Sequence, residues 1–174
     1  LFLLVVLIMH IAPIHTPRVR VKSCSLAELI DRAVAHIPER SILAVTSKVV
    51  SLCEGSAVPL SSASKETLIQ KESDYYIPAK KSKWGITLTL TNNILIPSAG
   101  IDESNTDWHF LLWPRNAQKT ANMLRAHLIR RFRRRAVGVF ITDIKTAPLR
   151  RGTTGVALAH SGFDALTDYV GSAD

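Results

Sequence analysis

The chain has 174 residues, of which 47% are hydrophobic and 21% are charged, and its formal net charge is +8. This composition excludes an intrinsically disordered chain and suffices for one domain with a sizeable core. The positive charge favours anionic partners such as nucleotides, polyglutamates or nucleic acid. The two cysteines, Cys24 and Cys53, form no CxxC or CxxH pattern, which argues against zinc, and so few thiols fit a reducing cytoplasm.

The first residues, LFLLVVLIM, are strongly apolar, but this run is far shorter than the roughly 20 residues that cross a bilayer. It also lacks the basic region and cleavage site of a signal peptide. We therefore expect no membrane span. We interpret residues 1–8 as a non-native upstream extension before a domain over residues 9–174, with a buried strand as the alternative. The last residues, DYVGSAD, complete no helix or strand, so we expect this domain to be incomplete at its C-terminus.

The first half of the chain alternates extended and helical patterns. Residues 9–19 are extended and are broken by prolines. A helix is predicted over residues 25–37, because a serine and a glutamate form a capping box at its start and apolar residues recur at helical spacing. A buried strand over residues 42–45 follows, and it leads into the polar step TSK.

The second half predicts two more helices and at least four strands. A capping serine begins a helix over residues 62–76, and a second helix covers residues 116–135. A hairpin is predicted over residues 85–100, in which apolar residues alternate in the first strand and Asn92-Asn93 forms the turn. Further strands are predicted over residues 136–143 and 152–163. Without a strict strand–helix–strand repeat, this order predicts an α+β (mixed α/β) fold in a single domain.

Two aspartates follow predicted strands at positions suited to a shared cation. Asp102 comes just after the hairpin, and Asp143 ends the strand over residues 136–143. Carboxylate oxygens suit Mg²⁺ or Mn²⁺ and leave open positions for phosphate oxygens. The alternative is that both are turn residues that accept hydrogen bonds from their own backbone.

Two basic features have competing interpretations. Lys48, flanked by hydroxyl residues after a strand, can hold a phosphate or can be a surface lysine at a strand end. The run RRFRRR over residues 130–135 can contact nucleic acid, but it lies at a helix C-terminus, where cations complement the helix dipole, and it lacks the aromatic interleaving of a base-stacking surface. A nucleic-acid partner is therefore not favoured. The sequence also contains no P-loop, no GxGxxG, no nucleophile elbow and no HExxH.

Several blocks, in order, resemble the signature of a known family. LAVTSKVVSLCEG, SAGIDESN and ITDIKTAPLRRGTTGVALAHSGFDALTDYVGSAD are similar to blocks of the coenzyme F(420):L-glutamate ligase family. KESDYYIP and WGITLTLTNNILIPSAGIDESN resemble its bacterial branch named for folate metabolism gamma-glutamate ligases. The resemblance runs from about Met9 to the last residue.

The resemblance implies an enzyme that forms a γ-glutamyl amide bond with GTP and a divalent metal, Mg²⁺ or Mn²⁺, with K⁺ as a further candidate ion. The nucleotide phosphorylates a carboxylate of a folate-like or deazaflavin acceptor, and the amine of free L-glutamate attacks the acyl phosphate. Phosphorylation supplies a leaving group that a carboxylate lacks, and metal and cations neutralise the charge of the transferring phosphoryl group. The family also implies a homodimer, and together with the low cysteine count we expect a cytoplasmic enzyme.

The resemblance assigns roles to individual positions. Asp102 and Asp143 resemble the metal-binding carboxylates. Three further places resemble nucleotide contacts, namely Ala12, Pro13 and Ile14, the pair Ser47 and Lys48, and Asn105. No residue is assigned a catalytic role.

Three departures from the family pattern leave the activity of the chain open. Leu52 stands where a basic nucleotide contact is common, Ser56 replaces an arginine, and Ile144 replaces a hydroxyl residue that ligates metal. The alternative function is therefore a non-catalytic or incomplete family member that acts as an anion- or nucleotide-binding module. A nucleic-acid binder that uses Arg130 to Arg135 is a third, less favoured hypothesis.

Overall fold

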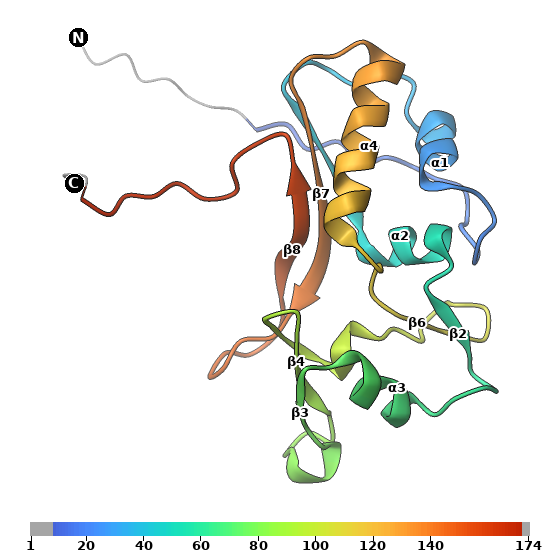
Figure 1. The fold of residues 1–174 in the computed structure, drawn as a ribbon, viewed down its shortest axis with the longest axis vertical. Coiled ribbons are helices and arrows are strands. Elements are labelled where there is room, and N and C mark those ends of the chain that lie inside the picture. The colour runs from blue at the N-terminus through green and yellow to red at the C-terminus, as the bar shows by residue number, and fades with distance from the viewer. Residues whose placement is uncertain (1–8, 172–174) are drawn as a thin grey trace.

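The computed structural model describes residues 9–171, and within them the chain forms a mixed α/β fold of four α-helices and three small sheets (Figure 1). This confirms the predicted fold class, while the proposed extension over residues 1–8 lies outside the described residues. The helices are α1 (Leu26–Ala33), α2 (Ser47–Glu54), α3 (Lys65–Glu72) and α4 (Ala117–Phe132). The strands are β1 (Ser41–Thr46), β2 (Ala57–Pro59), β3 (Tyr75–Ile77), β4 (Leu88–Thr91), β5 (Ile94–Pro97), β6 (His109–Leu111), β7 (Val137–Lys145) and β8 (Thr154–Ser161).

The main sheet has the strand order β1-β7-β8. β1 pairs with β7 in parallel, in a register that runs from Ser41 opposite Val137 to Thr46 opposite Thr142. β8 then pairs antiparallel on the other side of β7. Side chains on alternate positions of β7 point to the same face, and Val139 on that face is fully buried. β7 is therefore the central strand on which the core is built.

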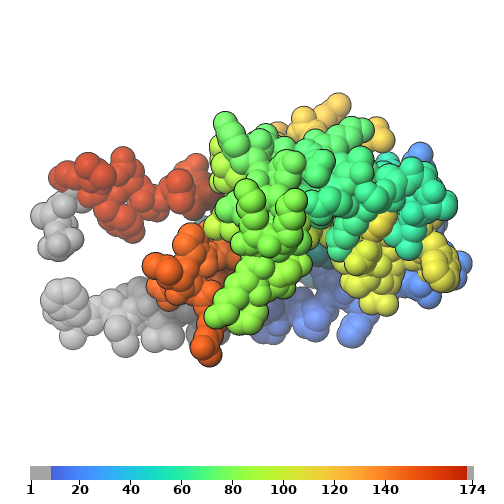
Figure 2. Space-filling model, turned by 90° about the horizontal axis from the view of Figure 1, so that it is seen from below, coloured from blue at the N-terminus to red at the C-terminus, as the bar shows by residue number. Residues whose placement is uncertain are grey.

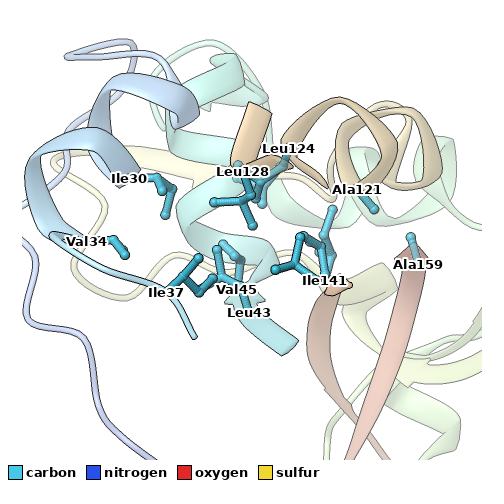
Figure 3. Packing of buried hydrophobic residues seen from close by; sticks show 13 residues of the cluster. Ile30, Val34, Ile37, Leu43, Val45, Ala121, Leu124, Leu128, Ile141 and Ala159 are labelled. Atoms are coloured by element: carbon cyan, nitrogen blue, oxygen red, sulfur yellow. The ribbon is translucent and has the colours of Figure 1, made fainter. Parts of the chain in front are cut away.

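The main core lies between this sheet and helices α1, α2 and α4 (Figure 3). On α4, Ala121, Leu124 and Leu128 are all buried and point toward the sheet. The side chain of Asn116 caps the helix by accepting a hydrogen bond from the backbone N–H of Lys119. Packing of an apolar stripe against a sheet supplies most of the stability of such a helix.

Helix α1 is shorter than predicted. Its capping box is present, with Ser25 and Glu28 bonding each other's backbone N–H, but the helix ends at Ala33 instead of continuing to residue 37. Val34 and Ile37 are nevertheless buried in the main core. The guanidinium of Arg134 donates a hydrogen bond to the carbonyl of Ile37 over 2.7 Å, so a tertiary contact replaces the helical pattern there.

The predicted hairpin is present as β4, the turn at Asn92-Asn93 and β5, but the apolar alternation does not mark its buried face. Ile86 lies outside the strand and is exposed, and the side chains of Leu88 and Leu90 are only partly buried. The threonines between them are the buried residues. The Thr89 hydroxyl explains this inversion, because it donates to the carbonyl of Ile96 and accepts from the N–H of Ala99, satisfying backbone groups inside the fold.

A second, smaller core lies around α3 and β6. It contains Leu68 and Ile69 of α3, packed against Ala99, Ile101 and Phe110. Seen from below, the β3–β4–β5 sheet (green) lies beside the loop between β7 and β8 (orange), and the chain after β8 (red) leaves the main body (Figure 2). Within residues 9–171, no helix is both long enough and apolar enough to cross a membrane.

We expect the Leu128→Ala substitution to lower the free energy of unfolding by about 2–5 kcal/mol, because Leu128 is completely buried between α4 and the sheet. Met123→Ala on the same helix is the control, since Met123 is 62% exposed and its removal should change that free energy by less than about 0.5 kcal/mol. Urea unfolding of both variants measures the difference. Equal losses would contradict the assignment of the core.

Candidate functional site

The parallel pairing of β1 with β7 creates the candidate site. Because Thr46 lies opposite Thr142, the next residues, Ser47 and Asp143, become neighbours at the same edge of the sheet. The Ser47 hydroxyl donates a hydrogen bond to Asp143 Oδ2 over 2.7 Å. Ser47 is also the first residue of α2, a helix that the sequence shows only as a polar step followed by apolar residues. The strand over 136–143 runs two residues further than predicted, to Lys145, so Asp143 lies within β7.

Within residues 9–171, the side chain of Asp143 accepts hydrogen bonds from three donors. Besides Ser47, the indole Nε1 of Trp113 donates to Asp143 Oδ2 over 2.6 Å, and the backbone N–H of Ile144 donates to Oδ1 over 2.7 Å. Two donors on one carboxylate oxygen fix the orientation of the side chain. The interaction with Ile144 is the local backbone contact that the alternative interpretation of this aspartate expects.

Asp102 reaches the same place from a loop closed by β6. Its backbone forms an isolated antiparallel bridge with Leu111. The side chain accepts two hydrogen bonds at Oδ1 from Ser104, and Lys48 Nζ lies 2.5 Å from its Oδ2. Burial acts to raise the pKa of Asp102, but the hydrogen bonds from Lys48 and Ser104 outweigh burial and hold the pKa below its ordinary value. Asp102 is therefore an anion at neutral pH.

These side chains line one cavity of about 230 Å³, which we call the carboxylate cavity. Its lining includes the N-terminus of α2, where the Thr46 side chain makes no capping hydrogen bond within the described part of the chain. A helix N-terminus carries partial positive charge and N–H donors that favour anions. The cavity thus combines two carboxylates, one lysine and a helix N-terminus. The lining residues are Thr46, Ser47, Lys48, Ser51, Gly100, Asp102, Leu111, Leu112, Trp113, Asp143 and Ile144.

Ser51 lies one helical turn after Ser47 on α2 and also lines the carboxylate cavity. It is 1% exposed, and its hydroxyl has no hydrogen-bond partner within residues 9–171. A buried hydroxyl without a partner costs roughly 1–3 kcal/mol, so the Ser51 hydroxyl is available to hydrogen-bond a water or a bound molecule in the cavity.

The structure brings together four of the residues that the sequence singles out, namely Ser47, Lys48, Asp102 and Asp143. Asn105 is exposed in the loop after Asp102 and does not line the carboxylate cavity. Residues 12–14 are also exposed and do not line it. The nucleotide contacts predicted for Asn105 and for Ala12, Pro13 and Ile14 therefore stay predictions, and the positions of these residues do not support them.

The three departures from the family pattern have different surroundings. Leu52 is buried in α2 and Ser56 is buried just after it, so neither presents a charge to the cavity. Ile144 lines the carboxylate cavity with its side chain 55% exposed, where a hydroxyl residue would add an oxygen. The aliphatic side chain reduces the number of oxygen ligands available at this edge.

Trp113 and Ser51 are site residues that sequence reasoning missed. Trp113 lies 30 residues before Asp143, and no spacing or motif links the two. The spacing of Ser51 could have indicated its place, because residues four apart on a helix share a face and Ser51 is four residues after Ser47. This inference needs helix α2, which the sequence did not predict.

The residues present fit a hard divalent cation only together with a phosphate. Within residues 9–171 no cluster of three or more histidine, cysteine or acidic residues is arranged to hold a metal. Mg²⁺, however, usually binds one or two carboxylates and completes its shell with waters and substrate phosphates. Each carboxylate oxygen has more than one lone pair, so Asp102 and Asp143 retain acceptor capacity beside their present donors.

The arginine run is partly engaged within the fold. Arg131 pairs with Asp31 over 3.3 Å, and Arg134 donates a hydrogen bond to the carbonyl of Ile37. Arg133 adopts a left-handed conformation at the C-terminus of α4. These contacts are those of a helix end, which agrees with the interpretation that the sequence favours.

Residues 13–174 match the sequence profile of the F420-0:gamma-glutamyl ligase family. The chain belongs to this family. The coenzyme F420:L-glutamate ligase of Methanopyrus kandleri is 30% identical over 182 residues, an alignment that spans 95% of this chain and 71% of that protein. The coenzyme F420:L-glutamate ligases of Methanococcus maripaludis strains C6 and C7 are each 39% identical over 77 residues, which span 44% of this chain and 31% of each relative.

We expect Gly100→Ala to displace Trp113 from Asp143. A Cβ atom at residue 100 would lie 2.1 Å from Trp113 Nε1, and Gly100 has a φ of +72°. Thermal unfolding and the fluorescence of Trp113 report the change in a background where the two exposed tryptophans, at 84 and 108, are replaced by phenylalanine.

Gly152→Ala is the matched control for this substitution. Gly152 has a φ of +83°, but a Cβ atom there meets nothing within 4 Å, so the control carries the backbone strain without the clash. Gly100→Ala should be the less stable variant by about 1–3 kcal/mol. Equal stability and unchanged fluorescence would show that Trp113 does not depend on Gly100.

Proposed function

We propose that the chain is a γ-glutamyl ligase of coenzyme F420 biosynthesis or a closely related pathway, and that it joins L-glutamate to an acceptor carboxylate activated as an acyl phosphate. GTP supplies the phosphoryl group, Mg²⁺ or Mn²⁺ is the divalent cation, and K⁺ is a further candidate ion. The acceptor is a deazaflavin or a folate-like molecule. A homodimer and a cytoplasmic location belong to the same proposal.

The convergence of Lys48, Asp102 and Asp143 on one cavity at the N-terminus of α2 is the observation that carries this proposal. Phosphoryl transfer requires little covalent participation from the protein, and its main requirement is positioning and charge neutralisation around the phosphates. The carboxylate cavity supplies both signs of charge in one place. Family membership agrees with this chemistry, and the charges that line the carboxylate cavity support it directly.

Lys48 and the first turn of α2 would bind phosphate oxygens. The Lys48 ammonium is a point charge beside Asp102, and it also donates to the carbonyl of Ser104 over 2.7 Å. This contact keeps Lys48 extended toward the cavity before any ligand is present. The uncapped backbone N–H groups of α2 add donors that suit the same anion.

Asp102 and Asp143 would hold the divalent cation, which when bound neutralises phosphate charge and lowers the barrier to phosphoryl transfer. Ser47 and Trp113 position Asp143 through the two hydrogen bonds on its Oδ2. Ser104 positions Asp102 in the same way through its Oδ1. Both carboxylates are therefore oriented by the protein itself.

A non-catalytic anion-binding module is the second candidate, and two observations favour it. Leu52 places a buried aliphatic side chain in α2 where a basic contact is expected, and the side chain of Ile144 offers no oxygen to a metal.

A mass assay separates the ligase from the non-catalytic module. The protein is incubated with isotopically labelled glutamate, GTP, Mn²⁺ and a panel of deazaflavin and folate acceptors, and a product heavier by one glutamate supports the ligase, whereas nucleotide binding without any product supports the module.

We expect Lys48→Met to weaken GTP binding at least about tenfold, because it removes a partly buried cation beside the phosphate position. Lys71→Met is the control, since Lys71 is exposed on α3 and its loss changes the net charge equally. Titration calorimetry with GTP and Mn²⁺ measures both. A loss of the same size in the two variants would mean that only the net charge of the protein matters, and would remove Lys48 from the site.

We expect Asp102→Asn to weaken binding of GTP with Mn²⁺ while leaving any metal-free binding of GTP unchanged or stronger, because the amide keeps the shape but loses the anionic ligand. Asp164→Asn, at an exposed position, is the control. Calorimetry with and without Mn²⁺ gives the comparison. Identical metal dependence in wild type and Asp102→Asn would defeat the metal role of this carboxylate.

A further inference from the structure

A second cavity of about 320 Å³ lies beside the carboxylate cavity, and we call it the Arg115 cavity. Leu112 and Trp113 line both cavities, so these residues form a shared wall. Ala99 lines the Arg115 cavity and its neighbour Gly100 lines the carboxylate cavity. A molecule in the Arg115 cavity would therefore be separated from the carboxylate cavity by little more than the Trp113 side chain.

The Arg115 cavity carries one positive and one negative side chain that do not neutralise each other. Arg115 and Glu72 both line it, and within residues 9–171 neither the guanidinium of Arg115 nor the carboxylate of Glu72 takes part in an ion pair or a hydrogen bond. Among the described residues, the one polar contact of Arg115 is made by its backbone N–H, which donates to Glu54 Oε2 over 3.3 Å. Opposite charges held apart on one cavity match a ligand that carries both charges.

The wall of the Arg115 cavity also contains a buried hydroxyl without a partner. Ser56 is 4% exposed, and its Oγ makes no hydrogen bond within the described part of the chain. The side-chain amide of Asn92, at the left-handed turn between β4 and β5, is a further neutral group at the cavity. A buried hydroxyl without a partner, an amide and two side chains of opposite charge on one cavity indicate a polar ligand with several hydrogen-bonding atoms.

We propose that the Arg115 cavity binds the free α-amino acid substrate, L-glutamate, with a carboxylate of the amino acid on Arg115 and its ammonium group on Glu72. This inference rests on the proposed ligase function, and it names the binding place of the second substrate. The volume is at the lower end of the roughly 300–1,000 Å³ of small-molecule sites, which suits an amino acid better than a deazaflavin. The shared wall at Trp113 places the amino acid next to the cavity where the acyl phosphate would form.

Binding of L-glutamate and of glutarate, which lacks the ammonium group, tests this assignment. Titration calorimetry is performed with and without GTP and Mn²⁺, so that an obligatory binding order does not hide the site. L-glutamate should bind the wild-type protein with a dissociation constant of about 1 mM or below, the upper end of ordinary KM values. Arg115→Met should weaken binding of both ligands at least about tenfold, whereas Glu72→Gln should weaken L-glutamate but not glutarate.

Two variants serve as controls. Arg151→Met removes an exposed arginine, and Glu66→Gln removes an exposed carboxylate on the same helix as Glu72. Both should bind L-glutamate as the wild type does. Circular dichroism melts confirm that each variant is folded before it is titrated.

The outcomes separate this inference from the proposed function. No L-glutamate binding to wild type under either condition, or equal effects of Glu72→Gln on L-glutamate and glutarate, would overturn the inference. If GTP binding still depends on Lys48 in that case, the proposed nucleotide chemistry stands without it. Intact, Arg115-dependent binding of L-glutamate together with no GTP binding would instead count against the proposed function and leave the amino-acid site in place.

Discussion

The parallel pairing of β1 with β7 is the constraint on which the rest of the structure depends. It aligns Thr46 with Thr142 and thereby joins Ser47 to Asp143, two residues that are 96 positions apart. The same pairing places α2 so that its N-terminus opens at the edge of the sheet, and it presents one face of β7 to α4. A slip of the register by one residue would turn the buried side chains of β1 outward, so the apolar core fixes the geometry of the polar site.

Trp113 connects β7 with the segment that follows β5. Its indole nitrogen bonds Asp143, its ring needs the space left by the absent side chain of Gly100, and it forms the wall between the two cavities. Gly100 ends a run of three residues with positive φ that begins at Ser98. Such backbone conformations are uncommon for residues other than glycine, and the Thr89 hydroxyl helps to hold this segment by accepting from the N–H of Ala99.

The parts of the fold that the sequence predicts well are those with local signals. The capping box at Ser25 is encoded within a few residues, as is the Asn92-Asn93 turn. The end of α1 was not predictable, because the guanidinium of Arg134, far along the chain, bonds the carbonyl of Ile37. The burial of Thr89 in β4 was not predictable either, because its hydroxyl bonds the backbone of a left-handed turn at Ala99. Helix α2 was not predicted, because the sequence there shows only a polar step followed by a short apolar run.

For the site, the sequence supplied the residue types and the resemblance supplied roles, but neither supplied the contacts. Asp102 and Asp143 were expected near each other, and both line the carboxylate cavity, while their part in metal binding stays a prediction. Their partners could not be inferred, since the Lys48–Asp102 and Trp113–Asp143 contacts join segments that no motif connects. The Arg115 cavity emerges only from folding, because Glu72 of α3 and Arg115 before α4 both line it from distant parts of the chain.

The central claim is that two carboxylates from different strands and loops hold one cation beside a phosphate at the start of α2. A crystal structure of the protein with Mn²⁺ and a non-hydrolysable GTP analogue, with the metal located by its anomalous scattering, tests it most directly. The account predicts a manganese peak bridging Asp102 and Asp143, with a phosphate oxygen as a further ligand and Lys48 moved onto the phosphates. A peak bound to neither carboxylate, or a triphosphate seated away from the N-terminus of α2, would contradict it.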